Sequence, residues 1–304
     1  MKWVFKVDAT SSSRFGRALS PLSADGKTGG KGLPSLPFIV LFSILFLTAC
    51  GKAPEKKSGD MRIVALAPSV AEVLCGLGLE NQVVGVSRYS VYPPEIKEKP
   101  AIGGLYDPNW EMIVALRPDI VIGLSFQSEI AAPLKQLGIP FLSVTHEKID
   151  EILDSIPAIG RAVHATAAAE KLYGELKHEY EALKQPATEN APAILVCVAR
   201  DETFGRMYVA GKDTFYDDII RAAGGRNAGA IQSPARYPEI SADGLEVLNP
   251  DLIVDILSDM GSASLHKWKT RTVTMTNEYA WTPGPRFVLL LRDLTEAIRE
   301  CNSN

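Results

Sequence analysis

The sequence predicts an α/β fold of two Rossmann-like lobes, each a parallel-rich sheet flanked by helices, joined by one long rigid α-helix. The first observation is a unit that occurs twice, at 111–122 and at 243–254, and reads acid, short apolar helix, Pro-Asp and apolar strand. Its acids, Glu111 and Asp243, are 132 residues apart, and a repeat of that length indicates two similar lobes rather than a solenoid. The second observation is the segment 166–183 between the copies, whose Ala, Glu, Leu and Lys content without Pro favours a long helix.

The repeated unit follows from simple helix and strand preferences. An acid in the first turn is favoured by the helix dipole. Pro118 and Pro250 end the helix because proline disfavours the α region in the residue before it. The apolar run after each Asp is typical of a buried parallel strand. Helix-Pro-Asp-strand connections are common in α/β proteins, but this alternative does not require an acid at the same place in both copies.

The composition narrows the class of protein. The chain has 304 residues, of which 46% are hydrophobic and 22% charged, so it is long enough for one large or two medium domains. The net charge of −4 argues against a nucleic-acid partner, which favours a basic surface. The four cysteines form no CxxC pair and no Cys/His group with zinc spacing. We expect no disulfide, with Cys75 and Cys197 as buried free thiols.

Residues 1–49 are expected to be a signal peptide. The apolar run 38–47 has about ten residues, which is too short to span a bilayer but fits the apolar region of a signal peptide. The run ends in Leu-Thr-Ala-Cys50, which resembles the bacterial lipoprotein lipobox, and the alternative is a short membrane anchor with a chance Cys. We therefore expect an exported protein, lipid-anchored through Cys50 at the cell envelope, with a polar tether at 50–61.

The first lobe is predicted at 62–150 from alternating strand and helix patterns. Ser69 and Glu72 have the spacing of a capping box, which predicts a helix at 70–77. The alternation is typical of a parallel sheet with helices on its faces. The strands are expected where short apolar runs are bounded by turn residues, at 62–68, 83–87, 120–122 and 141–145.

The interlobe segment is predicted at 151–185 and the second lobe at 190–304. Two helix patterns, 151–163 and 166–183, follow each other, and the second would span about 27 Å. In the second lobe we expect strands at 193–198 and 272–276 and a terminal helix from Arg286 through Glu300.

Several stretches, in this order and spacing, carry a family resemblance. They are 62–68, 85–94, 109–119, 210–215, 224–227, 240–251 and 283–286. Together with the lipobox and the central helix, they resemble the substrate-binding proteins of ABC importers, in the class that binds vitamin B12, haem or ferric siderophores. The resemblance implies a permease dimer with its ATPase as partners, a small-molecule metal chelate as cargo, and a monomer. We expect no nucleic-acid partner because of the charge, no cofactor, and no metal site of the protein's own because the chain offers no converging set of His and carboxylate residues.

The resemblance gives the repeated acids a role. One acid on each lobe of such proteins forms salt bridges with arginines of the permease, and Glu111 and Asp243 fall at those positions. Contacts of this kind contribute orientation and association rate more than affinity. The family usually has Glu at both places, so the shorter Asp243 is expected to weaken or re-aim its contact. The alternative for each acid is a simple helix-start preference.

The ligand is expected in a cleft between the lobes, at the carboxyl ends of the strands, as in other open parallel sheets. Aromatic side chains on these loops offer rigid apolar area with a polar tip, which suits a large, partly planar ligand. Core or rim positions are the alternative for about half of them. The candidates are Tyr89, Tyr92, Tyr106, Phe126, Phe204, Tyr208, Tyr237, Glu278, Tyr279 and Trp281.

Cobalamin or a related corrinoid is the expected cargo. The Tyr-Pro-Pro-Glu segment at 92–95, followed by Gly-Gly-Leu-Tyr-Asp-Pro-Asn at 103–109, resembles corrinoid-binding members. Leu105 and Leu124 stand where such members can carry Trp, and this departure keeps ferric siderophore or haem as the alternative.

Five further side chains are candidates for polar contacts. Arg88, Arg200 and Arg236 could meet an anionic ligand, whereas Arg286 is expected to brace its own turn. His146 follows a predicted strand, so it is either an axial metal ligand in the cleft or a surface residue.

Two other classes of protein compete with a transport receptor. An enzyme is disfavoured because the chain lacks a GxSxG elbow, a P-loop, an HExxH motif and a spaced Ser/His/Asp set. A sensor or adhesion lipoprotein on the same fold is the remaining alternative.

Overall fold

The computed structural model describes residues 61–186, 188–201, 205–256 and 270–302. The predicted signal peptide, the lipidation site Cys50, the tether up to residue 60 and Phe204 lie outside these residues. Within the described ranges, none of the helices is long and apolar enough to cross a membrane.

The first sheet has four strands in the order β2-β1-β3-β4, and all its pairs are parallel. They are β1 (Ile63–Ala65), β2 (Val83–Val86), β3 (Ile120–Leu124) and β4 (Phe141–Val144). The four predicted strands are confirmed. Because every strand runs in the same direction, all four carboxyl ends lie at one edge of the sheet.

Helices cover both faces of the first sheet. They are α2 (Pro68–Gly76), α4 (Trp110–Ala115), α5 (Ala131–Gln136) and α6 (Ile149–Ala162), with α3 (Pro94–Lys97) and the 3-10 helix η1 (Ser125–Ile130) in the loops. On one face, Ile63 and Ala65 of β1 share a cluster with α2 and α6. On the other, Val64 of β1 shares a cluster with Ile113 of α4 and Leu134 of α5. Alternate side chains of a strand therefore fill two separate layers.

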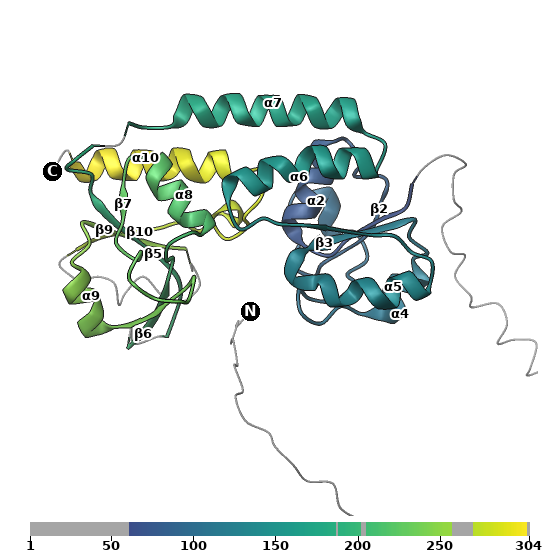
Figure 1. The fold of residues 1–304 in the computed structure, drawn as a ribbon, viewed down its shortest axis with the longest axis horizontal. Helices are drawn as coiled ribbons and strands as arrows, with labels where there is room; N and C mark the ends of the chain where they lie inside the picture. The colour runs from purple at the N-terminus through teal and green to yellow at the C-terminus, as the bar shows by residue number, and fades with distance from the viewer. Residues whose placement is uncertain (1–60, 187, 202–204, 257–269, 303–304) are drawn as a thin grey trace, which may run out of the picture. The chain divides into compact units, whose positions relative to one another are not determined.

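Two consecutive helices, α6 and α7 (Thr166–Leu183), connect the sheets. The bounds predicted for α7 are confirmed, and α6 begins two residues before its predicted start. Figure 1 shows α7 over α6 and, further along, over α10 (Phe287–Asn302) of the second lobe. There Arg292 Nη2 donates to Glu179 Oε1 at 2.7 Å. The connecting helix is thus tied to elements of both lobes.

The second sheet is mixed, with the strand order β10-β9-β5-β6-β8 and β7 beside β5. Its strands are β5 (Ala193–Arg200), β6 (Arg206–Val209), β7 (Arg226–Asn227), β8 (Glu239–Ser241), β9 (Leu252–Asp255) and β10 (Arg271–Thr274). The pairs of β5 with β7 and β9, and of β9 with β10, are parallel. β6 pairs antiparallel with β5 and β8. The prediction of a parallel-rich sheet therefore holds for β5, β7, β9 and β10 but not for β6 and β8.

The core of the second lobe also has two layers. Its helices are α8 (Phe215–Ala222), α9 (Ala242–Leu248), the 3-10 helix η3 (Glu278–Ala280) and α10. Leu245 of α9 lies in a cluster confined to this lobe. Phe215 of α8 and Phe287 of α10 instead belong to the same buried cluster as α2 and α6. One apolar layer is therefore shared by both lobes, and α4 and α9 lie on the sheet faces away from it.

The repeated unit has the same local structure in both lobes. Asp119 Oδ2 accepts from Arg62 N at 2.9 Å, and Asp251 Oδ2 accepts from Ala193 N at 2.7 Å. Each carboxylate thus holds the start of the neighbouring central strand. The residue before each proline has a positive φ, 45° at Arg117 and 40° at Asn249, which stops the helix.

Two local predictions in the first lobe were wrong. The capping box does not form, because α2 begins after Ala67, whose side chain makes no cap, and Ser69 and Glu72 bond elsewhere. Cys75 is only half-buried, whereas Cys197 is buried as predicted. Cys75, Cys197 and Cys301 are free thiols.

Candidate functional site

Most of the predicted ligand-binding side chains lie on loops that follow parallel strands. Tyr89 and Tyr92 follow β2, Phe126 follows β3, and Glu278 with its neighbours follows β10. Carboxyl ends of parallel strands are the usual place for ligand sites in open α/β sheets. The structure therefore puts these residues where such sites form, and their contact with a ligand stays a prediction.

Arg286 gathers residues from both lobes. Its Nε and Nη2 donate to Glu72 of α2 at 3.0 and 2.6 Å, and its Nη1 lies 3.5 Å from Glu278 Oε1. The guanidinium carbon lies 3.7 Å from the ring centroid of Tyr92 and 5.7 Å from that of Tyr279. The prediction that Arg286 braces its own turn was therefore wrong, because its side chain contacts other segments and its main partner, Glu72, is 214 residues away.

The Glu72–Arg286 pair is largely removed from water. Burial raises the pKa of Glu72 above its ordinary value, and the bonded Arg286 opposes that rise. A bidentate, charge-assisted pair fixes both side chains in one geometry. Because Tyr92 stacks on the same guanidinium, the pair also fixes the position of that predicted ligand contact.

A second aromatic group lies on the first lobe. The rings of Tyr106 and Phe126 have centroids 5.1 Å apart at an interplanar angle of 35°, and both side chains are exposed. Beside them, Arg88 Nη2 donates to Asp107 Oδ2 at 2.5 Å. Gly103 has a φ of +98°, and a Cβ there would lie 2.4 Å from the backbone oxygen of Asp107 and 2.8 Å from Asn109 N, so this loop requires glycine at that position. The exposed ring pair forms an apolar surface whose two rings are inclined to each other.

The remaining aromatic candidates are on the second lobe. Tyr208 of β6 donates its hydroxyl to Glu239 Oε2 of β8 at 2.7 Å, and this hydrogen bond raises the pKa of Tyr208. Tyr208, Tyr237 and Trp281 are exposed. Within the described residues, these three side chains make no hydrogen bond, ion pair or ring contact with one another, so the structure presents them as separate surfaces.

Charged pairs close the seam between the lobes. Arg236, beside Tyr237, forms an ion pair with Glu147 just after β4. Lys148 Nζ donates to Asp213 Oδ1 at 3.1 Å, and the backbone N–H of Ile149 donates to Asp218 Oδ2 at 3.1 Å. Sequence reasoning missed these partners because each contact joins segments that are far apart in the chain. The one available signal was the group of charged residues directly after β4.

His146 is a structural residue, and both predictions made for it were wrong. Its side chain is 5% exposed, and its Nδ1 and Nε2 each lie 2.8 Å from a hydroxyl, of Ser69 and Ser155 respectively. Burial lowers the pKa of His146 to about 4. Because both ring nitrogens are engaged, His146 is neither a surface residue nor an open metal ligand.

Arg200 is also internal. Its Nε and Nη2 donate to Asp255 Oδ2 at 3.0 and 2.9 Å, and both side chains are buried in the second lobe. This pair links β5 to β9 and places the charge of Arg200 away from solvent. Within the described ranges, no three His, Cys, Asp or Glu side chains come together in a group that could hold a metal ion.

The repeated acids are exposed on equivalent helices. Glu111 lies in the first turn of α4 and Asp243 in the first turn of α9. Asn109 caps α4 by accepting from Met112 N at 3.0 Å, and Ser241 caps α9 by accepting from Gly244 N at 3.1 Å. Because the caps satisfy these helix starts, neither acid is needed for capping.

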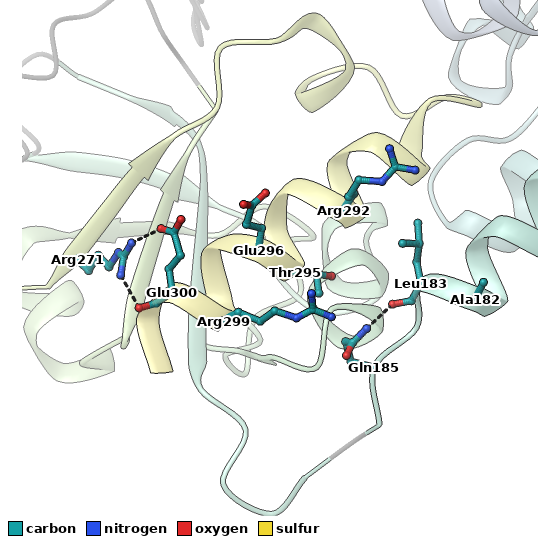
Figure 2. A pocket seen from close by; sticks show the side chains of 9 residues that line it. All are labelled: Ala182, Leu183, Gln185, Arg271, Arg292, Thr295, Glu296, Arg299 and Glu300. Carbon is teal, nitrogen blue, oxygen red and sulfur yellow. Dashed lines mark hydrogen bonds and ion pairs between the residues drawn. The ribbon is translucent and has the colours of Figure 1, made fainter. Parts of the chain in front are cut away.

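A cavity of about 690 Å³ lies elsewhere, between the end of α7 and α10 (Figure 2). Arg271 donates there to the backbone oxygen of Glu300 at 2.8 Å and to its Oε2 at 2.5 Å. This cavity includes none of the predicted ligand residues. Its lining is Ala182, Leu183, Gln185, Arg271, Arg292, Thr295, Glu296, Arg299 and Glu300.

Comparison with known proteins gives consistent matches along the described chain. Residues 63–270 match the family described as periplasmic binding protein. An uncharacterized ABC transporter substrate-binding lipoprotein of Bacillus subtilis is 27% identical over 264 residues, covering 80% of this chain and 81% of the relative. A vitamin B12-binding protein of Photorhabdus laumondii is 24% identical, covering 91% of this chain and 98% of the relative. The solved apo structure of the periplasmic haem-binding protein RhuT from Roseiflexus superposes with a TM-score of 0.70 at 28% identity, covering 80% of this chain and 99% of that chain.

Proposed function

Because the chain belongs to the periplasmic binding protein family, we propose that it is the substrate-binding component of an ABC importer that captures cobalamin or a related corrinoid. The observation that carries this proposal is the set of aromatic loops at the strand ends of both lobes, in a chain similar to a vitamin B12-binding protein over nearly its whole length. The role is binding and delivery rather than catalysis, in line with the substrate-binding relatives.

The proposed ligand contacts are the aromatic groups of the two lobes. A corrin is large and partly planar, and the exposed Tyr106–Phe126 pair offers it apolar aromatic surface. Tyr92, Glu278 and Tyr279 surround Arg286 across the seam. The remaining proposed contacts are Tyr89, Tyr208, Tyr237 and Trp281.

Delivery is proposed to use Glu111 and Asp243. Each acid stands exposed on a helix of its own lobe, and within the described residues neither has an ion-pair partner. Two such carboxylates suit bidentate contacts with arginines of the permease dimer, whose ATPase completes the importer. The acids would orient the monomeric receptor on its partner.

An exported location is supported by the substrate-binding relatives. Lipid anchoring through Cys50 is proposed from the Leu-Thr-Ala-Cys sequence alone. It would keep the receptor near its permease, where the effective concentration of a tethered partner is high.

Haem or a ferric siderophore is the second candidate cargo. It is favoured by the similarity to the haem-binding structure from Roseiflexus and by the exposed tyrosines of both lobes. A sensor lipoprotein on the same fold would bind the same ligand without a permease.

Titration of the purified protein with cyanocobalamin, haemin and ferric siderophores decides between these cargoes. We expect cyanocobalamin to bind in the micromolar range or tighter. Tyr106→Ala and Phe126→Ala should each weaken that binding about 10-fold. Tyr173→Ala, an aromatic substitution on α7, is the matched control and should leave affinity unchanged. Absence of micromolar cyanocobalamin binding would sink the first choice, and tight haemin binding would support the second.

The docking acids are tested separately from the ligand. Glu111→Arg or Asp243→Arg should abolish ligand uptake into cells, because each variant opposes a permease arginine with a like charge. Ligand affinity in solution should not change. Normal uptake by either variant would contradict a docking role.

A further inference from the structure

The helix that carries Glu111 exposes unusual apolar surface. Of the six residues of α4, Ile113 is fully buried and anchors the helix to the sheet. Trp110, Met112 and Val114 remain 37%, 37% and 42% exposed. Large exposed apolar side chains that surround a charge, on a helix with its own polar cap, indicate an interaction surface rather than a core.

The equivalent helix of the second lobe is different. In α9, Leu245 takes the buried place of Ile113. At the repeat offset, however, Ala242 and Gly244 stand where α4 has Trp110 and Met112. The structure describes α9 along its full length, and among its residues Val247 is the exposed large apolar side chain, with an exposed fraction of 84%. The exposed surfaces of α4 and α9 therefore both carry an acid, but only the acid of α4 is surrounded by exposed apolar side chains.

From this difference we infer that the two docking faces are unequal: Trp110, Met112 and Val114 form an apolar anchor on α4, whereas α9 contributes mainly the charge of Asp243. This inference rests on the proposed docking function. Trp110 and Val114 are one helical turn apart, so their side chains are neighbours beside Glu111. Tryptophan is enriched among the few residues that carry most of an interface's binding energy, whereas exposed rim charges carry little.

The partner that fits the α4 face is a permease surface with an arginine next to an apolar pocket. A guanidinium can pair with Glu111 and also lie over the Trp110 indole, because arginine stacks on aromatic faces as well as binding carboxylates. A bare membrane surface fits less well, since anionic headgroups repel Glu111. A second copy docking through the same face would bring two Glu111 side chains together, which is unfavourable.

The difference between the lobes also predicts the order of docking strength. Trp110 is partly held by its surroundings, so little side-chain freedom is lost when it is covered. Val247 stands nearly free of neighbours and offers a smaller area. Substitutions on the first lobe should therefore cost more affinity than matched substitutions on the second.

The test measures the dissociation constant of the full chain for its cognate permease–ATPase complex in nanodiscs. Trp110→Ala should weaken binding on the order of 10- to 30-fold, and Val247→Ala, at the exposed apolar residue of α9, by less than about 3-fold. Ligand affinity should be unchanged in both variants. Equal effects of the two substitutions, or no effect of Trp110→Ala, would overturn the inference.

Two further arms separate the inference from the proposed function. If Glu111→Arg and Asp243→Arg abolish binding but Trp110→Ala does not weaken it, the docking role stands and the apolar anchor is wrong. If none of the three variants changes binding, the docking role itself fails. Binding to empty nanodiscs, or a concentration-dependent dimer that Trp110→Ala abolishes in sedimentation, would assign the face to lipid or to a second copy and overturn the permease as its partner.

Discussion

Replacing His146 should remove part of the acid sensitivity of the fold. The imidazole is buried between the hydroxyls of Ser69 and Ser155, in the segment that leads from β4 into α6. We choose His146→Gln, because the amide keeps a donor and an acceptor and does not titrate. His178→Gln, an exposed histidine on α7, is the matched control.

The size of the effect follows from the pKa of His146, which burial lowers from 6.5 to about 4. Between these two values the unfolded chain binds a proton that the folded chain does not bind. The free energy of unfolding therefore falls as the pH falls, by about 1.4 kcal/mol per pH unit. Over the whole window the loss from this one group is about 3 kcal/mol. Above pH 6.5 the contribution of His146 does not change with pH.

Urea unfolding at several pH values from about pH 4.5 to about pH 7.5 measures this dependence. Carboxylates that titrate in the same range are present in all three proteins, so the difference between wild type and His146→Gln isolates the imidazole. The variant should be less stable than the wild type at neutral pH. Between the two pKa values, its free energy of unfolding should fall less steeply with falling pH, and the two slopes should differ by about 1.4 kcal/mol per pH unit. His178→Gln should follow the wild type. Parallel curves for wild type and His146→Gln would refute the reasoning.

The Glu72–Arg286 ion pair and the two carboxylates that accept from strand N–H groups lead to further predictions. Glu72→Gln and Arg286→Met should each destabilise the fold by about 3 kcal/mol, because each leaves a buried charge without its main partner. The double variant should lose less stability than the sum of the two single variants. Additive losses in urea unfolding would contradict direct coupling between the two side chains. Asp119→Ala and Asp251→Ala should each cost about 2 kcal/mol by removing the acceptor for a strand N–H, whereas the Asn variants keep an acceptor oxygen and should cost less. Equal losses for Ala and Asn would show that the hydrogen bond is not the cause.

The sequence predicts those parts of the fold that depend on local patterns. The strands of the first sheet and the helix α7 are continuous apolar or helix-favouring runs, and their places in the chain were predicted closely. The pairing of β6 was not predicted. Its four residues alternate in burial and are too few to distinguish an antiparallel hairpin from a loop.

Tertiary contacts overrode local chemistry at the start of α2. Ser69 and Glu72 have the spacing of a capping box, but Ser69 bonds His146 and Glu72 bonds Arg286. Both partners lie on segments brought in by the fold, so no local window contains the competing interaction. The same holds for the candidate site: most of the candidate aromatics lie on loops as predicted, although Tyr208 lies in the strand β6, and the sequence does not show that Arg286 groups Tyr92 with Tyr279.

The two kinds of acid in the repeat have different explanations. Asp119 and Asp251 recur because each holds the N–H that begins a central strand, so folding alone accounts for them. Glu111 and Asp243 recur at the same offset, yet within the described residues they form no ion pair, and Asn109 and Ser241 already cap their helices. Their contribution to the helix dipole, a few tenths of a kcal/mol at an exposed site, is a weak reason for the same position to be acidic in both lobes. A partner outside the chain that meets both lobes explains the repetition better, and the apolar surround of Glu111 indicates which lobe that partner holds more tightly.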